Sequence, residues 1–152
     1  DLRSYRRLMS RCHEIGPKPY AESATAWKEL SSWAEEQGSG LLTRLLTPAL
    51  STAAERAAIT DARRRLARLA VAAEIHRAET GAYPKTADEL VPVRLDEVPV
   101  DPFDGKPLRL RTTEQALVLY SVGPNGVDDG GADGREDERA RDLVFVLAGA
   151  KK

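Results

Sequence analysis

The fold of this chain is decided by its last third, from Gly81 to Leu147. Three stretches carry most of the signal: Gly81-Ala82-Tyr83-Pro84, Val98-Pro99-Val100-Asp101-Pro102-Phe103-Asp104-Gly105 and Leu119-Tyr120-Ser121-Val122-Gly123-Pro124-Asn125-Gly126. An acidic, glycine-rich stretch, Val127 to Arg141, and a short apolar segment, Leu143 to Leu147, follow. Proline, Asn-Gly and Asp-Gly pairs mark turns. The region therefore indicates short strands joined by ordered loops.

Three strands are expected here. Leu108 and Leu110 alternate with Arg109 and Arg111, which is typical of a half-buried strand. Residues 116–122 are more continuously apolar and predict a central strand, and residues 142–147 predict a third. We expect an antiparallel meander of these strands. A short helix before them is predicted by Thr86 and Glu89, which have the spacing of a capping box.

Helices are expected in the rest of the chain. Thr47-Pro48 predicts the start of a long helix, with an N-cap followed by proline, and an interruption is possible at Thr60-Asp61. Gly81 is expected to end this helix as its C′ residue. Before it, Gly16-Pro17 ends one predicted helix and Ser23 is expected to cap a second. The Leu41–Leu46 stretch predicts a short apolar helix or turn. The fold class is therefore α+β, with a helical region at 1–47 and the long helix plus head at 48–152.

Composition excludes several classes of protein. A chain of 152 residues can bury one substantial core, and its net charge of −1 argues against a nucleic-acid binder. The single cysteine, Cys12, excludes an intrachain disulfide. No apolar run reaches the roughly 18 residues of a transmembrane helix. Because the chain starts at Asp1 without methionine, we expect a fragment, from which any upstream anchor would be missing.

The order of these motifs resembles the globular head of a type II secretion major pseudopilin, over about residues 61–147. The resemblance implies a long helix, a Tyr-Pro turn, an architectural Asp-Pro-aromatic loop, and a small antiparallel sheet whose last loop holds calcium. The chain departs from that family at its start, where about 60 residues of helical sequence replace the apolar polymer-forming helix. Either a membrane segment lies upstream, or the head is grafted onto a different protein; we favour the second interpretation.

The acidic loop is the strongest candidate site. Its crowded carboxylates must be either solvated or neutralised by a cation, and calcium suits carboxylate and carbonyl oxygens. The glycines would let backbone carbonyls turn inward. The resemblance implies carbonyl ligands at the loop's start and aspartates near its end. On this basis the candidate calcium ligands are Ser121, Val122, Asp128, Asp129, Asp137 and Asp142.

No catalytic motif accompanies this loop. The sequence contains no nucleophile elbow, phosphate-binding glycine loop or paired histidines. An acid–base pair of Asp101 and Asp104 is conceivable, but no other polar cluster converges with it, so we expect this loop to be structural. His76, one of the two histidines of the chain, lies near the end of the long helix and is expected to be structural or solvated. We therefore expect no enzyme.

The N-terminal helices carry the second candidate. Trp27 aligns with Leu30 and Ala34 and is most simply a core residue, whereas the alternative is that Trp27 and Trp33 line a partner-binding groove. The sequence thus predicts an extracytoplasmic assembly or interaction protein with protein partners or self-assembly. The expected location is the periplasm or the cell surface, with a tether to the inner membrane as one option. The other hypothesis is a peptide- or protein-binding module that uses the N-terminal helices, with the head as scaffold.

Overall fold

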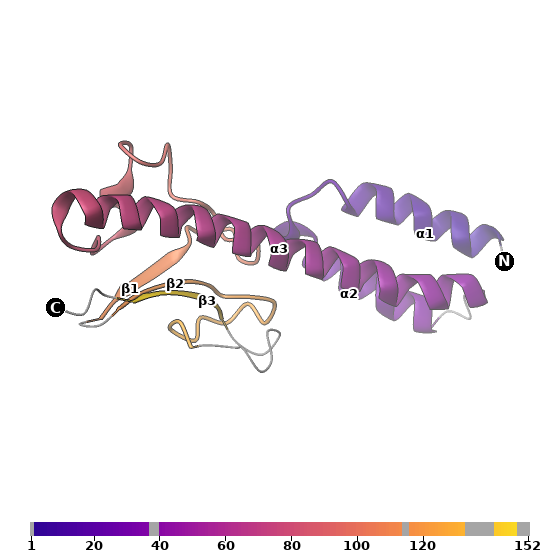
Figure 1. The fold of residues 1–152 in the computed structure, drawn as a ribbon. Coiled ribbons are helices and arrows are strands. Elements are labelled where there is room, and N and C mark those ends of the chain that lie inside the picture. Colours follow the sequence, from indigo (N-terminus) through magenta and orange to yellow (C-terminus); the bar gives the residue numbers. More distant parts are fainter. Residues whose placement is uncertain (1, 37–39, 114–115, 133–141, 149–152) are drawn as a thin grey trace. The chain divides into compact units, whose positions relative to one another are not determined.

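A computed structural model describes residues 2–36, 40–113, 116–132 and 142–148 of the chain. Three helices come first and a three-stranded antiparallel sheet comes last, which confirms the α+β class (Figure 1). The chain forms two compact units, Asp1–Ala58 and Ile59–Lys152. The boundary lies inside the third helix, 11 residues beyond the boundary expected from the sequence, so each unit contains part of that helix.

The first unit is helical and has a core of its own. Helix α1 (Leu2–Ile15) and helix α2 (Tyr20–Glu36) contribute the buried side chains of Leu8, Ile15, Trp27 and Leu30. Half-buried residues of both helices and of α3 pack against these four: Cys12, Tyr20, Ala26, Trp33, Leu50 and Ala54. Burial of such apolar area is the main favourable term in folding a unit of this size.

Helix α2 starts at Tyr20, four residues before Ala24, the first helical residue predicted from a Ser23 N-cap. Ser23 is not an N-cap but lies in the first turn, where its buried hydroxyl donates to the carbonyl oxygen of Pro19 at 3.0 Å. Pro19 directly precedes Tyr20 and has no N–H to satisfy, so it is well suited to a helix start. The serine therefore stabilises the first turn from inside it.

Helix α3 extends from Leu41 to Thr80 without a break, so the predicted start at Thr47-Pro48 is wrong. Pro48 lies within the helix, and Thr47 donates its hydroxyl to the carbonyl of Thr43 at 2.7 Å. The possible interruption at Thr60-Asp61 does not occur either. The carboxylate of Asp61 accepts from Arg64 and Arg65, each at 2.7 Å, and so stabilises the helix by i,i+3 and i,i+4 pairs.

The end of α3 is as predicted. Gly81 has a φ of +83° and donates its N–H to the carbonyl of Arg77 at 2.8 Å. This left-handed conformation is open to glycine without a steric penalty. The following short helix, η1 (Ala87–Leu90), is a 3₁₀ helix, and the predicted capping box is absent. The Thr86 side chain makes no capping bond, and Glu89 instead accepts the N–H of Lys85 at 3.3 Å.

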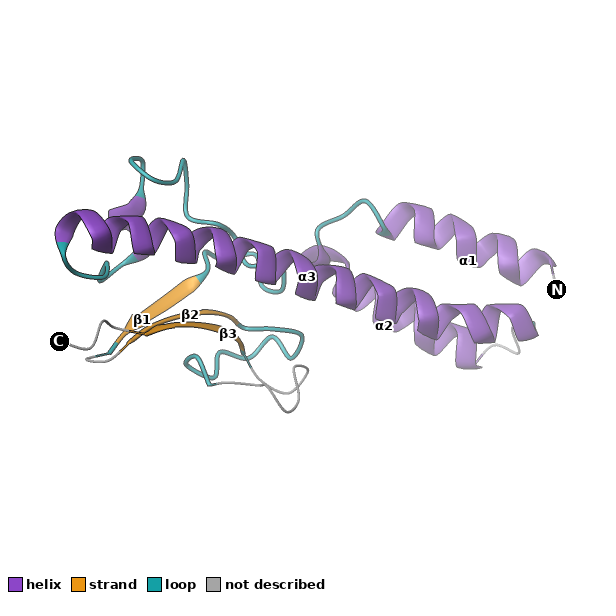
Figure 2. Cartoon of the chain, in the orientation of Figure 1, coloured by secondary structure: helices purple, strands orange, loops and turns teal. Residues whose placement is uncertain are grey.

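The sheet consists of β1 (Arg109–Thr112), β2 (Ala116–Ser121) and β3 (Leu143–Ala148), in the order β1-β2-β3 (Figure 2). Strand β2 is central, as the sequence predicts, and pairs with both neighbours in antiparallel register. Arg109 lies opposite Tyr120, and Ser121 lies opposite Leu143. Because β2 is buried almost along its whole length, it anchors the sheet.

The second unit buries the small-residue face of α3 together with the sheet. On the helix the buried residues are Ala62, Leu66, Leu69, Ala70, Ala72 and Ala73; from the sheet and loops they include Leu90, Phe103, Leu108, Leu117, Leu119 and Leu143. Polar contacts also join the helix and its C-terminal turn to the head, among them those of Arg65 and Tyr83. Arg65 donates to the carbonyl of Val100 at 2.5 Å, and the Tyr83 hydroxyl donates to Glu74 and to Ala148 of β3.

Candidate functional site

The Asp-Pro-Phe-Asp-Gly loop is held by one fully buried carboxylate, that of Asp101. It accepts hydrogen bonds from the Ser121 hydroxyl at 2.9 Å, from the Val122 N–H at 2.9 Å and from the Phe103 N–H at 3.0 Å. A buried carboxylate is tolerated only when donors replace its hydration. Asp101 therefore ties its own loop to the end of β2, which agrees with the architectural role expected from the sequence.

Arg109 on β1 supplies the positive charge beside this carboxylate. Its guanidinium contacts Asp104 at 2.6 Å, Asp128 at 2.9 Å and Asp101 at 3.6 Å. One guanidinium can donate in several directions at once. Arg109 is thus placed to neutralise acidic residues from both the Asp101–Gly105 loop and the start of the acidic loop.

Asp142 is the second fully buried carboxylate, and it closes the acidic loop. It accepts the N–H of Gly131 at 2.6 Å and the N–H of Asp129 at 3.2 Å. Gly131 has a φ of +77°, and a Cβ there would lie 3.1 Å from the side chains of Tyr120 and Val118. A glycine is therefore needed at this point for the backbone to reach Asp142.

The two carboxylates Asp104 and Asp142 respond differently to their surroundings. Burial raises the pKa of Asp142, and the charges of Asp129 and Asp128 raise it further, against the two amide hydrogen bonds that lower it. For Asp104, burial also opposes ionisation, but the contacts of Arg109 and the Lys106 amide outweigh it and lower the pKa. The negative charge around Asp142 is therefore less well neutralised than the charge around Asp104, which has Arg109 beside it.

The candidate calcium ligands are only partly brought together. Asp128, Asp129 and Asp142 lie in one electrostatic neighbourhood, but Asp128 pairs with Arg109, and Asp129 accepts from Asn125 at 3.2 Å. The Ser121 hydroxyl and the Val122 N–H bind Asp101, but the ligand atoms expected at the start of the loop are backbone carbonyl oxygens, on which these two contacts do not bear. Asp137 lies outside the described residues. Within the described ranges, no three His, Cys, Asp or Glu side chains are arranged to hold a metal ion.

Arg109 was missed by sequence reasoning, which grouped it with Arg111 on the polar face of a strand. The structure leaves only 19% of the Arg109 side chain exposed. The sequence feature that could have indicated its role is its charge, since Arg109 is a basic residue four positions after Gly105 in a region with many aspartates. Sequence spacing alone does not reveal that the two acidic loops converge on it.

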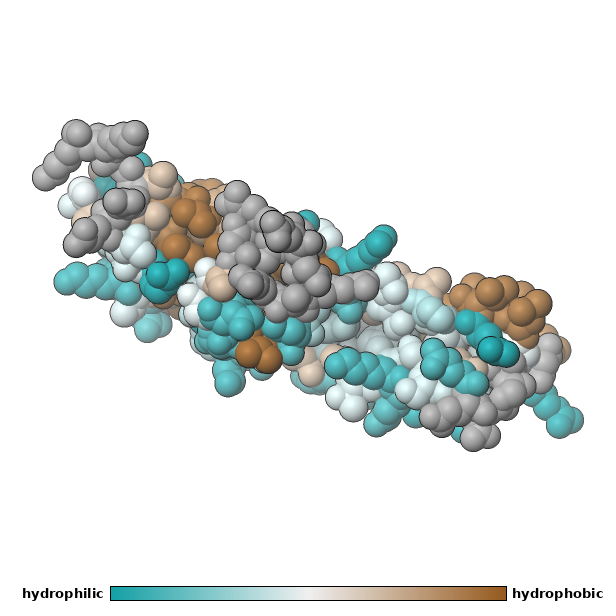
Figure 3. Space-filling model, turned by 90° about the horizontal axis from the view of Figure 1, so that it is seen from below, coloured by the Kyte–Doolittle hydropathy of each residue, from teal (hydrophilic) through white to brown (hydrophobic). Residues whose placement is uncertain are grey.

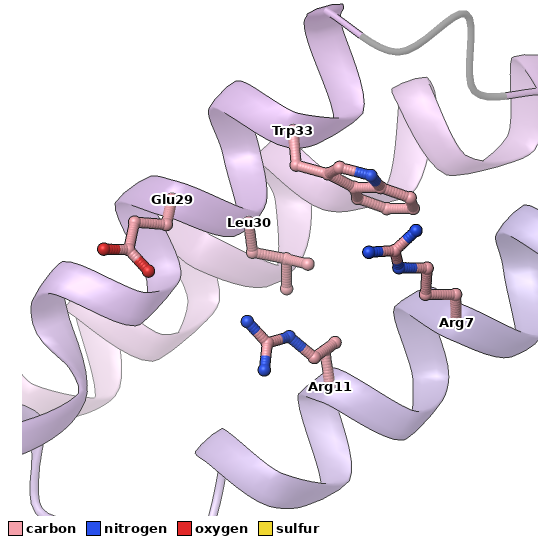
Figure 4. A pocket seen from close by; sticks show the side chains of 5 residues that line it. All are labelled: Arg7, Arg11, Glu29, Leu30 and Trp33. Atoms are coloured by element: carbon pink, nitrogen blue, oxygen red, sulfur yellow. The ribbon is translucent and has the colours of Figure 1, made fainter.

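The two tryptophans have different environments. Trp27 is 8% exposed and belongs to the core of the helical unit. Trp33 is half-buried, and the guanidinium of Arg7 lies 5.1 Å from its ring centroid. Trp33 lines a pocket of about 200 Å³ between α1 and α2, together with Arg7, Arg11, Glu29 and Leu30 (Figure 4). Only the second tryptophan is therefore placed to meet a ligand.

A second surface feature of the helical unit is apolar. At the start of α3, the side chains of Leu41, Leu42 and Leu45 are 74%, 59% and 64% exposed. Figure 3 shows brown, apolar surface on the helical unit, in the region where α3 begins. Exposed leucines grouped at i, i+1 and i+4 on a helix are typical of a contact surface.

Comparison of this chain with protein families, curated proteins and solved structures finds no match. None of the described helices combines the length and the apolar character needed to cross a membrane.

Proposed function

We propose that this chain is a non-enzymatic, extracytoplasmic protein that assembles through protein–protein contacts, with a pseudopilin-like head. The observation that carries the proposal is the use of the head's acidic residues. Asp101, Asp104, Asp128 and Asp142 each bind a guanidinium, hydroxyl or amide of the head itself. Carboxylates used in this way stabilise a scaffold. The order of helix, Asp-Pro-aromatic loop and antiparallel sheet supports the same interpretation, through the resemblance described above.

We further propose that the acidic loop binds calcium. The support is electrostatic, since the charges of Asp128 and Asp129 disfavour ionisation of the buried Asp142. A divalent cation beside them would remove this repulsion and favour oxygen ligands. The described residues do not complete a ligand set, so the proposal requires further oxygens from the loop. Asp142 and Asp129 would contribute from the described part, while Arg109 already neutralises Asp128.

The alternative function is a protein- or peptide-binding module that uses the N-terminal helices. It is favoured by the pocket that Trp33 lines and by the exposed leucines of α3. On this view the head serves only as a scaffold. The two functions differ in which unit carries the contact, and they share the expectation that the protein acts by binding.

Sedimentation velocity tests the assembly proposal. We expect the purified chain to sediment as species larger than the monomer, in proportions that increase with protein concentration from about 5 to 200 µM, a range in which weak specific contacts become populated. Calcium and EDTA should be compared at each concentration. A monomer throughout, at both low and high salt, would contradict self-assembly.

A further inference from the structure

Strand β3 forms an open edge of the sheet. It pairs with β2 on one side, and in the described part of the chain no strand pairs with its other side (Figure 2). Its six residues, Leu143–Ala148, include no charged residue and no proline. Charges and prolines are the usual means by which an edge strand avoids pairing with another chain. The outer edge of β3 is therefore unprotected against a further strand.

The ladder between β1 and β2 fixes the direction of the backbone groups in β2. Thr113 donates its N–H to the carbonyl oxygen of Ala116 at 2.8 Å, so these two residues are a hydrogen-bonded pair. In an antiparallel ladder such pairs alternate with pairs that exchange no hydrogen bond. Ala116 and every second residue after it therefore bond to β1, and the residues between them bond to β3. These residues are Leu117, Leu119 and Ser121.

The same alternation shows which backbone groups of β3 point outward. Every second residue of β3, beginning with Leu143, is the partner of one of those three β2 residues. The N–H and carbonyl groups of Val144, Val146 and Ala148 therefore point away from the sheet. The Tyr83 hydroxyl agrees with this assignment, because it donates to the carbonyl oxygen of Ala148 at 3.2 Å. The two valines thus present outward backbone groups, whereas the outward carbonyl of Ala148 is already bonded.

The side chains at this edge are apolar and accessible. Phe145 is 40% exposed and Val146 is 47% exposed. Successive residues of a strand lie on opposite faces of the sheet, so the edge is open on both faces at this point. An apolar strand with outward backbone groups suits the addition of another extended, apolar strand.

Among the described strands, β3 itself matches this edge. Strand β2 is paired on both sides, and β1 carries the exposed Arg111. Because β3 has no carboxylate, a contact between β1 of one copy and β3 of another would desolvate this arginine without compensation. Two β3 strands bring no charges together. The uncharged edge therefore selects a second β3 as its partner.

We propose that two copies of this chain pair antiparallel through their β3 edges, so that their three-stranded sheets join into one. The inference rests on the proposed function and names a contact through which assembly occurs. Because the carbonyl of Ala148 is bonded to Tyr83, the favoured register places Val144 of one copy opposite Val146 of the other. This register uses the outward N–H and carbonyl groups of both valines. Phe145 then faces its own counterpart across the two-fold axis. The same patch is used on both copies and the outer strands become the two β1 strands, so the pairing closes at the dimer.

Edge substitutions test this surface by sedimentation equilibrium. Val146→Lys places a charge on the edge, and Val144→Pro removes an outward N–H while leaving the bonds to β2 in place. Val71→Lys is the matched control on α3, where Val71 is 60% exposed. We expect the wild type and Val71→Lys to show the same monomer–dimer equilibrium, and each edge variant to dimerise at least tenfold more weakly. Far-UV circular dichroism checks that each variant is folded.

Cysteine cross-linking tests the register. In a Cys12→Ser background, which removes the native thiol, Phe145→Cys places two thiols in a non-hydrogen-bonded pair. The Cα atoms of such a pair lie about 4.5 Å apart, within reach of a disulfide. Val146→Cys is the matched control, because its counterpart lies two residues, about 7 Å, further along the strand. We expect mild oxidation to link Phe145→Cys at least tenfold faster than Val146→Cys. Faster linking of Val146→Cys would overturn the proposed pairing.

The outcomes separate this inference from the proposed function. Weaker association in both edge variants, together with rapid linking of Phe145→Cys, supports the contact. Association that both edge variants leave unchanged would overturn this inference but not the assembly proposal. A wild-type chain that stays monomeric would overturn both.

Discussion

The buried carboxylates of Asp101 and Asp142 show how single residues shape this head. Asp101 has three donors and a guanidinium 3.6 Å away, so its charge is compensated inside the protein. Asp142 has two amide donors and two acidic neighbours, and its pKa is raised. Asp101 therefore stabilises the head as it stands, whereas Asp142 leaves negative charge for a cation or a proton to neutralise.

Acidification should reveal this difference. Because the native pKa of Asp142 is above the unfolded value, the native state takes up its proton first as the pH falls. The wild type should therefore gain stability relative to Asp142→Asn as the pH falls through the native pKa towards 3.8, with no further gain below it. Chemical denaturation of both proteins in EDTA at several pH values between 7 and 4 measures this. A difference that is constant with pH would show that Asp142 titrates normally.

Gly131 gives a second test at this scale. Both Gly130 and Gly131 have positive φ, but a Cβ at Gly130 meets nothing within 4 Å, whereas at Gly131 it meets Tyr120 and Val118 at 3.1 Å. We expect Gly130→Ala to cost about 1 kcal/mol for the left-handed backbone. Gly131→Ala should cost about 1–3 kcal/mol more, because the close contact adds to it. Urea unfolding of the two variants measures both losses of stability. Equal losses would contradict the close contact of Gly131 with Tyr120 and Val118.

Helix α3 shows why element boundaries are hard to predict. Thr47-Pro48 has the pattern of a helix start, yet the helix begins six residues before Thr47. Inside a helix, Pro48 lacks the N–H that would bond to the carbonyl of Arg44. Because Pro48 lies only two turns after Leu41, the missing hydrogen bond weakens only the first part of the helix. Local pattern alone cannot decide whether the Leu41–Leu46 stretch joins the helix that follows it.

Replacing this proline should stabilise the helix. We expect Pro48→Ala to raise the free energy of unfolding by about 1–2 kcal/mol, because the restored hydrogen bond and helix propensity exceed the stabilising effect of proline on the unfolded state. Pro17→Ala, in the turn between α1 and α2, serves as the control and should lose a few tenths of a kcal/mol. Denaturation followed at 222 nm makes the comparison. A loss of stability in Pro48→Ala would show that α3 does not pass through this residue as a regular helix.

The elements marked by short-range chemistry were predictable. Gly81 as the helix end, β2 as the central strand and the structural Asp101–Gly105 loop all follow from local pattern, and the structure agrees. The capping box at Thr86 failed because the following residues form a 3₁₀ helix, in which Glu89 contacts Lys85 instead. The role of Arg109 could not be predicted, because it depends on contacts with aspartates that are distant in the sequence.

At the scale of the whole molecule, the two units contain different kinds of candidate surface. The helical unit has the Arg7–Trp33 pocket and exposed leucines, whereas the head has buried carboxylates and an acidic loop. The sequence indicated both candidate surfaces. Trp33 pointed to the one in the helical unit, and the acidic residues Asp128, Asp129 and Asp142 pointed to the one in the head. The sequence did not reveal the division at Ala58, since the dividing point lies within one continuous helical pattern.

We propose that a cation stabilises the acidic loop as part of a structural head. Thermal unfolding of the metal-free chain with millimolar calcium, and with magnesium as control, tests it most directly, because a ligand of the native state raises stability by mass action. We predict a rise of several degrees in Tm with calcium, little change with magnesium, and a much smaller calcium effect in Asp142→Asn. An unchanged Tm, or equal rises with both metals, would contradict the claim.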